Sequence, residues 1–245
     1  MDVDPRQGRL RRLRWSAGKI VRRMIGREVR KPPRSIPNDL GVEGFFAELR
    51  DRHVRYVVLR WFERLPYVRP GSDVDLLIHD DDVATVEALL TDAKQDVKCD
   101  LYSVSGLPGT MYRARGRELP GVSYFPRERA AAVLNGAQVR DLYRVPNPED
   151  HFLSLAYHAV YQKGPKSGVP SQYPEIVPDP TPKHDHATIL AELGRAAGID
   201  VAIDMEALDS FLARRGWRPS DQAIEALRPY NPWIAAHFGT ASHQS

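Results

Sequence analysis

Cysteine is nearly absent from this chain of 245 residues, and long apolar runs are absent altogether. The single cysteine, Cys99, excludes an intramolecular disulfide and a cysteine-based zinc site, and it fits a reducing compartment. No run of about 18 apolar residues occurs, so no membrane-spanning helix is expected. The basic start is not followed by the apolar stretch of a signal peptide. We therefore predict a cytoplasmic protein.

Acidic residues are scarce only at the N-terminus. Residues 1–34 contain 12 Lys and Arg against 3 Asp and Glu, whereas the rest of the chain contains 23 against 29. Leu10, Leu13, Ile20 and Met24 recur at helical spacing there, which predicts a basic amphipathic helix. Such a helix can lie on an anionic surface, here the inner face of a membrane; a docked helix or a solvated arm is the alternative. The acidic remainder argues against long nucleic acid as a partner.

Two aspartates, Asp73 and Asp75, stand one residue apart at the start of the apolar run that ends at Ile78. In a β-strand, residues i and i+2 point to the same side, so both carboxylates project together. Paired carboxylates repel each other unless a cation lies between them. Hard oxygen ligands without Cys or His beside them suit Mg²⁺ or Mn²⁺.

A third carboxylate, Asp100, lies in the predicted strand 96–103. The segment 79–93 between the two strands has the pattern of a helix, and a strand–helix–strand unit brings its strands into one sheet. Asp100 is therefore expected to join Asp73 and Asp75 as a metal ligand or catalytic group. The alternative is a surface carboxylate at the end of a strand.

The order of these features resembles the DNA polymerase beta-like nucleotidyltransferase superfamily over roughly residues 54–103. A predicted strand, 54–59, is followed by a turn through Pro70-Gly71 and then by Ser-Asp-x-Asp-Leu-Leu-Ile. The resemblance implies that Asp73, Asp75 and Asp100 hold Mg²⁺ at the phosphates of a nucleotide. It also implies that Asp100 aligns or deprotonates the hydroxyl of an acceptor.

One departure from that superfamily concerns the Gly-Ser that cradles the triphosphate after the first strand. Arg60-Trp61 stands there instead. Arg60 is the candidate replacement, because a guanidinium binds phosphate with two parallel hydrogen bonds. Gly71-Ser72 abuts the aspartates and is predicted to be a turn, and Ser72 is kept as a second candidate for contact with the donor.

The chain as a whole is expected to be α/β (mixed α+β), with a small mixed sheet flanked by helices. We predict a basic arm over 1–34, a nucleotidyltransferase-like core over 35–146 and a helical C-terminal subdomain over 147–245. The subdomain includes a long loop, 163–183, rich in Pro, Gly and Ser, from which Lys163, Lys166 and Ser167 are candidates to close over a phosphorylated substrate.

Several local elements follow from the same patterns. A helix is expected over 38–51 with Asn38 or Asp39 as its N-cap, and strands are expected over 120–125 and 139–145, separated by a helix over 127–134. The three aspartates 80–82 are expected to cap a helix N-terminus rather than to bind metal. His184 and His186 resemble a metal-ligand pair, but the start of a helix is the simpler interpretation.

These expectations define a Mg²⁺-dependent transferase that moves a nucleotidyl group to a hydroxyl of a small molecule, glycan or protein. The donor is a nucleotide or nucleotide-sugar. One alternative is a phosphoryl- or glycosyltransferase on the same fold that acts in cell-envelope polysaccharide synthesis. A second is a catalytically degenerate nucleotide-binding or regulatory domain. A third alternative is that the protein is an unrelated α/β domain, in which the three carboxylates are only surface charges.

Overall fold

A mixed sheet of four strands forms the centre of residues 34–239, the part of the chain that the computed structural model describes. The expected basic helix of the N-terminal arm lies outside these residues, as does the tail from residue 240. The strands are, in spatial order, β1 (Ser35–Ile36), β4 (Val97–Ser103), β3 (Asp73–Ile78) and β2 (Tyr56–Val58). The sheet and its flanking helices confirm the predicted α/β class.

The two central strands, β3 and β4, run parallel, whereas β1 and β2 pair with them antiparallel. Parallel neighbours require a crossover connection. It is supplied by a 3₁₀ turn, η2 (Asp80–Asp82), and by α3 (Val83–Leu89), so the expected strand–helix–strand unit is present. The helix ends at Leu89, earlier than the predicted residue 93.

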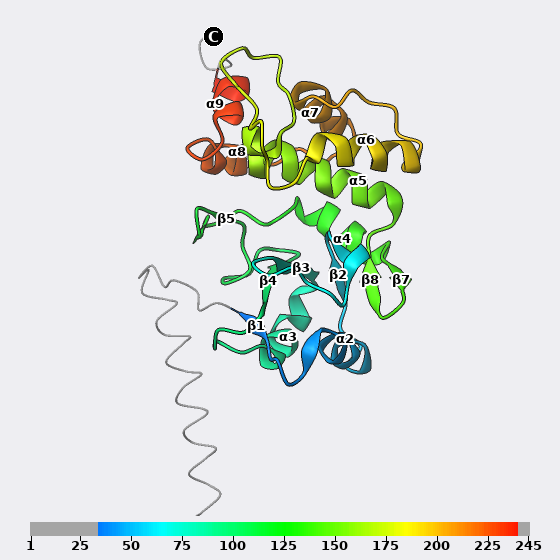
Figure 1. Ribbon diagram of the computed structural model, residues 1–245. Coiled ribbons are helices and arrows are strands. Elements are labelled where there is room, and N and C mark those ends of the chain that lie inside the picture. The colour runs from blue at the N-terminus through cyan, green and yellow to red at the C-terminus, as the bar shows by residue number, and fades with distance from the viewer. Residues whose placement is uncertain (1–33, 240–245) are drawn as a thin grey trace, which may run out of the picture. The chain divides into compact units, whose positions relative to one another are not determined.

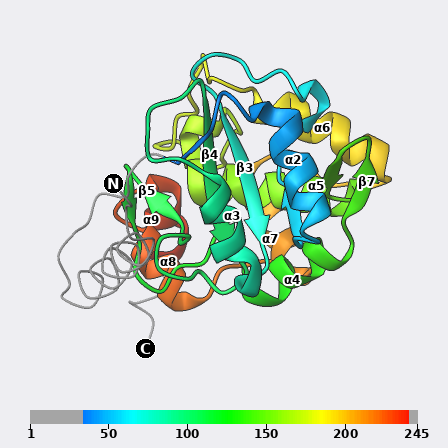
Figure 2. The same ribbon diagram turned by 90° about the horizontal axis from the view of Figure 1, so that it is seen from below.

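Side chains at alternating positions of the central strands point to opposite faces of the sheet, and each face carries its own hydrophobic cluster. Val74, Leu76 and Ile78 of β3 pack in the cluster that includes the apolar side of α2 (Gly41–Asp51) and α3. Leu77, which alternates with them, packs in the other cluster together with the C-terminal helices. Figures 1 and 2 show α2 and α3 on one side of β3 and β4, with α5 on the other. Asp73 and Asp75 lie four and two residues before Leu77 in β3, so their side chains point to the same face as Leu77, toward the C-terminal helices.

Six helices follow the sheet in the part of the chain that ends at residue 239. They are α4 (Arg127–Asn135), α5 (Pro148–Tyr157), α6 (His186–Ala197), α7 (Met205–Arg214), α8 (Asp221–Leu227) and α9 (Pro232–Gly239). Helix α5 continues as a π-helical segment, η3 (His158–Lys163), and then as a 3₁₀ turn, η4 (Gly164–Ser167). The first part of the predicted loop 163–183 is therefore helical.

Two short hairpins complete the fold, and one of them corrects a prediction. The predicted strand 139–145 is a hairpin of β7 (Gln138–Arg140) and β8 (Tyr143–Val145), turned at Asp141 with φ +55°. The other hairpin, β5 (Arg113–Ala114) and β6 (Arg117–Glu118), was not predicted. These strands are too short for a period-2 pattern to identify them.

Two further predictions were wrong for local reasons. Residues 120–125 form no strand: the chain turns at residues 120–121, where Gly121 adopts φ +76° and the Val122 N–H donates to the Leu119 carbonyl, and it bends at residues 124–125. Helix α2 begins at Gly41 without a side-chain cap, because the Asn38 amide instead donates to Asp96 at 3.0 Å. In both places a tertiary or turn contact overrides the local propensity.

Candidate active site

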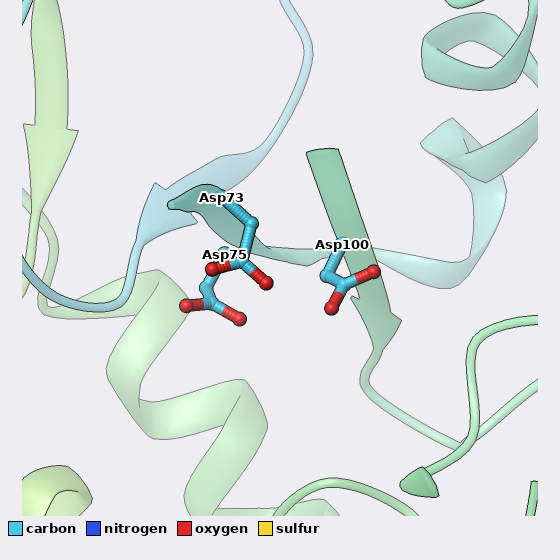
Figure 3. A group of neighbouring side chains, drawn as sticks. All are labelled: Asp73, Asp75 and Asp100. Atoms are coloured by element: carbon cyan, nitrogen blue, oxygen red, sulfur yellow. The ribbon is translucent and has the colours of Figure 1, made fainter. Parts of the chain in front are cut away.

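The three predicted carboxylates come together on one face of the sheet. Asp73 and Asp75 project from the same side of β3, and Asp100 lies directly across from Asp75 in the parallel register with β4 (Figure 3). One oxygen from each of the three carboxylates lies within 4.8 Å of the other two. Asp75 is 4% exposed, whereas Asp73 and Asp100 are half-buried. The cluster is thus deep at Asp75 and reachable from solvent at the other two.

The cluster is electrostatically strained, and this strain appears in the pKa values of Asp75 and Asp100. Burial raises the pKa of Asp75 to about 7; the charges of Asp73 and Asp100 act in the same direction, and Arg60 opposes them. Burial also raises the pKa of Asp100, with Asp73 adding to the shift and Arg113 opposing it. Carboxylates that resist ionisation beside one another are stabilised by a cation placed among them.

A divalent cation fits this set of donors. Three carboxylates within one ion's reach are the oxygen ligands that Mg²⁺ and Mn²⁺ prefer. Cys99, the neighbour of Asp100, points into the hydrophobic cluster on the opposite face and adds no soft ligand. Two arginines offset part of the charge: Arg60 at Asp75, and Arg113 at 3.6 Å from Asp100. Asp73, Asp75 and Asp100 would therefore hold the metal.

Arg60, the candidate phosphate residue, lies at the site but is already bonded. Its side chain is 10% exposed, one Nη lies 2.9 Å from Asp75 Oδ2, and the other donates to the Tyr124 hydroxyl at 2.5 Å. Phosphate contact by Arg60 therefore stays a prediction. Ser72 closes a turn, its backbone N–H donating to the Arg69 carbonyl at 2.9 Å, as expected of Gly71-Ser72.

An uncommitted cation lies beside the carboxylates. Lys163, at the end of η3, has an exposed side chain with no ion pair or hydrogen bond among the described residues. Partial desolvation by the neighbouring side chains and the charge of Arg60 lower the pKa of Lys163, whereas the charges of Asp75 and Asp73 raise it, so Lys163 lies near both groups. Ser167, proposed with it, is fully buried and donates to the Gly164 carbonyl, so it does not face a substrate.

The remaining polar candidates have structural partners. The three aspartates stand at the start of α3 as expected, with Asp82 at its N-cap position, but the Asp82 carboxylate makes no capping bond. Asp82 accepts instead from the backbone and side chain of Arg55, and Asp80 accepts from the Ser105 N–H. His186 begins α6, as predicted, and Asp185 is its N-cap. His184 stacks on Trp61 with ring centroids 4.2 Å apart.

Tyr124 and Gln162 belong to the site, and sequence reasoning did not identify them. Tyr124 is buried and bonds Arg60 through its hydroxyl, and the Gln162 side chain donates to the Tyr124 carbonyl at 2.8 Å. The only available signal was that Gln162 and His158 share a helix face, which does not show what that face contacts.

Comparison with known proteins does not place the chain in a family. No family model matches it, and it has no match among curated proteins or solved structures. Between residues 34 and 239, none of the helices combines the length and the apolar character that crossing a membrane requires.

Proposed function

We propose that this protein is a Mg²⁺-dependent transferase that moves a nucleotidyl group from a nucleotide to a hydroxyl. One observation carries the proposal: Asp73, Asp75 and Asp100 converge from two parallel strands, with Asp75 buried and its pKa raised. A fold gains nothing from three carboxylates packed this closely, so a cation-dependent function is the simplest reason for them. The resemblance to nucleotidyltransferases over residues 54–103 supports the reaction type.

In this proposal each residue has a defined task. Asp73, Asp75 and Asp100 hold the metal, which, when bound, neutralises charge on the donor phosphates. The half-buried Asp100, which lies across from Asp75 in the register of β3 and β4, is placed to align the attacking hydroxyl and accept its proton. The hydroxyl oxygen forms a bond to the α-phosphorus, the bond to the leaving pyrophosphate breaks, and the proton passes to Asp100. Lys163 supplies positive charge beside the leaving group.

The acceptor belongs to the class of small molecules, glycans or proteins. Residues 35–245 carry more acidic than basic side chains, and this balance disfavours a long polyanion. The basic arm at the N-terminus suits work at the inner face of a membrane, and that arm lies outside the described residues.

A second candidate function is transfer of a phosphoryl group from a nucleoside triphosphate or of a glycosyl group from a nucleotide-sugar, each of which releases a nucleoside diphosphate. It is favoured by Arg60, which stands where a Gly-Ser cradle would follow the first strand and is bonded to Asp75. A site without that cradle grips a triphosphate through fewer backbone donors. A regulatory domain that binds nucleotide without turnover is the third candidate.

A transfer assay separates these candidates. The purified protein is incubated with Mg²⁺, each nucleoside triphosphate or nucleotide-sugar, and a mixed panel of hydroxyl acceptors. Released pyrophosphate, nucleoside diphosphate and modified acceptor are quantified by mass spectrometry. Pyrophosphate release that Asp73→Asn abolishes supports nucleotidyl transfer, and diphosphate release supports the second candidate. Donor binding without any product would support the third.

A further inference from the structure

Arg60 is held more firmly than a substrate-binding arginine needs to be. It follows β2, its guanidinium is almost fully buried, and its two Nη atoms are shared between Asp75 Oδ2 and the Tyr124 hydroxyl. The guanidinium also lies over the Tyr124 ring, 5.7 Å from its centroid. Arg60 is therefore held at two points, by Asp75 of the carboxylate cluster and by the Tyr124 hydroxyl.

Tyr124 is fixed in turn by the π-helical segment η3. His158 Nδ1 lies 3.0 Å from the Tyr124 hydroxyl and 2.6 Å from Gln162 Oε1, while Gln162 Nε2 donates to the Tyr124 carbonyl at 2.8 Å. The carbonyl contact fixes the orientation of the Gln162 amide, so Oε1 faces His158 and Nδ1 must carry the hydrogen. The Tyr102 ring packs on Tyr124 with centroids 3.8 Å apart. π-Helical segments are frequent at functional sites, and this one supplies the support for Arg60.

The ion pair between Arg60 and Asp75 limits how many cations the three carboxylates can hold. In a two-metal site the ions lie about 3.5–4 Å apart, and a shared carboxylate must offer one oxygen to each. Asp75 is the deepest of the three carboxylates and the register partner of Asp100, so it is the natural shared ligand. Its Oδ2 is occupied by Arg60, and a second cation at that oxygen would lie against the guanidinium. One oxygen of Asp75 is left for a metal.

We propose that Arg60 is a fixed counter-ion, held by Tyr124, His158 and Gln162, that reserves one oxygen of Asp75 so that the centre takes one divalent cation instead of two. This inference rests on the proposed function, because it assumes that the carboxylates bind metal. It assigns Tyr124, His158 and Gln162 as positioning residues that act through Arg60.

Mn²⁺ binding to the full chain tests the inference without any assay of activity. Free Mn²⁺ is measured by electron paramagnetic resonance during a titration at pH 8, which gives both the number of bound ions and their affinity. The wild type should bind one Mn²⁺ per chain. Arg60→Gln should bind a second ion, or bind the first at least about tenfold more tightly. Tyr124→Phe, which keeps the packed ring, should tighten binding several-fold because Arg60 loses an anchor.

Arg113→Gln is the matched control. Arg113 lies beside Asp100 at 3.6 Å and contributes charge without occupying Asp75. Its loss should change affinity modestly and leave one ion per chain. If Arg60→Gln does not fold, as judged by circular dichroism, Tyr124→Phe decides the matter alone.

Three results would overturn the inference. Two ions bound to the wild type would show that Arg60 does not limit the site, and would leave the proposed function intact. Unchanged binding in Tyr124→Phe would show that the support from η3 does not act on the metal centre. No Mn²⁺ binding by the wild type would remove the metal centre, and with it both the inference and the proposed function.

Discussion

Asp75 combines burial with a need for negative charge, and this conflict makes the protein sensitive to pH. Its pKa in the folded state, about 7, lies above the ordinary aspartate value of about 3.9. The folded state therefore holds the proton more tightly than the unfolded state does. The stability that Asp75 contributes is fully present below about pH 4 and is lost as the pH rises to about 7, a change on the order of a few kcal/mol.

A bound cation should reverse this loss, because it needs the ionised carboxylate. We predict that Mn²⁺ raises the melting temperature strongly at pH 8 and weakly at pH 5. Differential scanning fluorimetry across this range, with and without Mn²⁺, measures the effect, and Asp75→Asn is the control that should remove it. Equal stabilisation at both pH values would contradict this account of Asp75.

Asp73 offers a second test at the level of one side chain. Asp73→Asn removes a negative charge beside Asp75 and Asp100, so the metal-free protein should gain stability. An increase of about 1 kcal/mol corresponds to about 2–4 °C for a chain of this size. Transfer activity should fall by a factor of roughly 10³ or more, because a metal ligand is lost.

The surface variant Asp51→Asn, made at an exposed helix end, should change neither quantity. A loss of both stability and activity in Asp73→Asn would instead indicate that Asp73 is a structural residue. A gain in stability together with a loss of activity in Asp73→Asn is the result expected of a functional site whose charges destabilise the fold.

At the scale of elements, the π-helical segment η3 depends on one buried residue far along the chain. Asn231 is 2% exposed, and its amide donates to the Val160 and Tyr161 carbonyls at 2.8 and 3.0 Å. Asn231→Ala would leave these carbonyls without a donor, and we predict a loss of about 2 kcal/mol. Urea denaturation measures it, with the exposed Asn135→Ala as control. A loss below about 0.5 kcal/mol would show that η3 does not need this support.

Much of the central unit could be predicted from local pattern. Strand β3 was placed correctly, because an apolar run with two leading aspartates has few other solutions, and the crossover to β4 brought Asp100 into register as the strand–helix–strand rule requires. These predictions depend only on elements that are adjacent in the sequence, so a short stretch of sequence is enough to place β3, β4 and their aspartates.

The surroundings of Asp75 could not be predicted in the same way. The bond from Arg60 to Tyr124 joins residues 64 positions apart, and no periodicity indicates it. Tyr124 itself lies in a stretch that was predicted to be a strand and is instead irregular, with a bend at Tyr124. The position of Arg60 after the first strand indicated that it belonged to the site, but not that it would bond to Asp75.

At the scale of the whole molecule, both hydrophobic clusters share one sheet, so residues 34–239 should unfold as a unit. Phe46 is fully buried in the cluster on the α2 side and packs on Tyr56 and Tyr143. Phe46→Ala should cost about 3–5 kcal/mol. Trp217 and Trp233 report on the opposite cluster.

We predict that Phe46→Ala shifts tryptophan fluorescence and far-ultraviolet circular dichroism to the same lower urea midpoint. Coincident transitions are the test of cooperative unfolding. Two separate transitions would show that the predicted core, 35–146, and the predicted helical subdomain, 147–245, fold independently.

Nucleotide binding that depends on Mg²⁺ and on the carboxylates is the decisive measurement for the proposed metal-dependent transfer. Thermal shift is recorded for the wild type and for Asp73→Asn/Asp75→Asn with a panel of nucleoside triphosphates and nucleotide-sugars, with and without Mg²⁺. We predict that a particular donor stabilises the wild type only with Mg²⁺, and that the double variant does not respond. Stabilisation that is the same without Mg²⁺ or in the double variant, or no response to any donor, would contradict it.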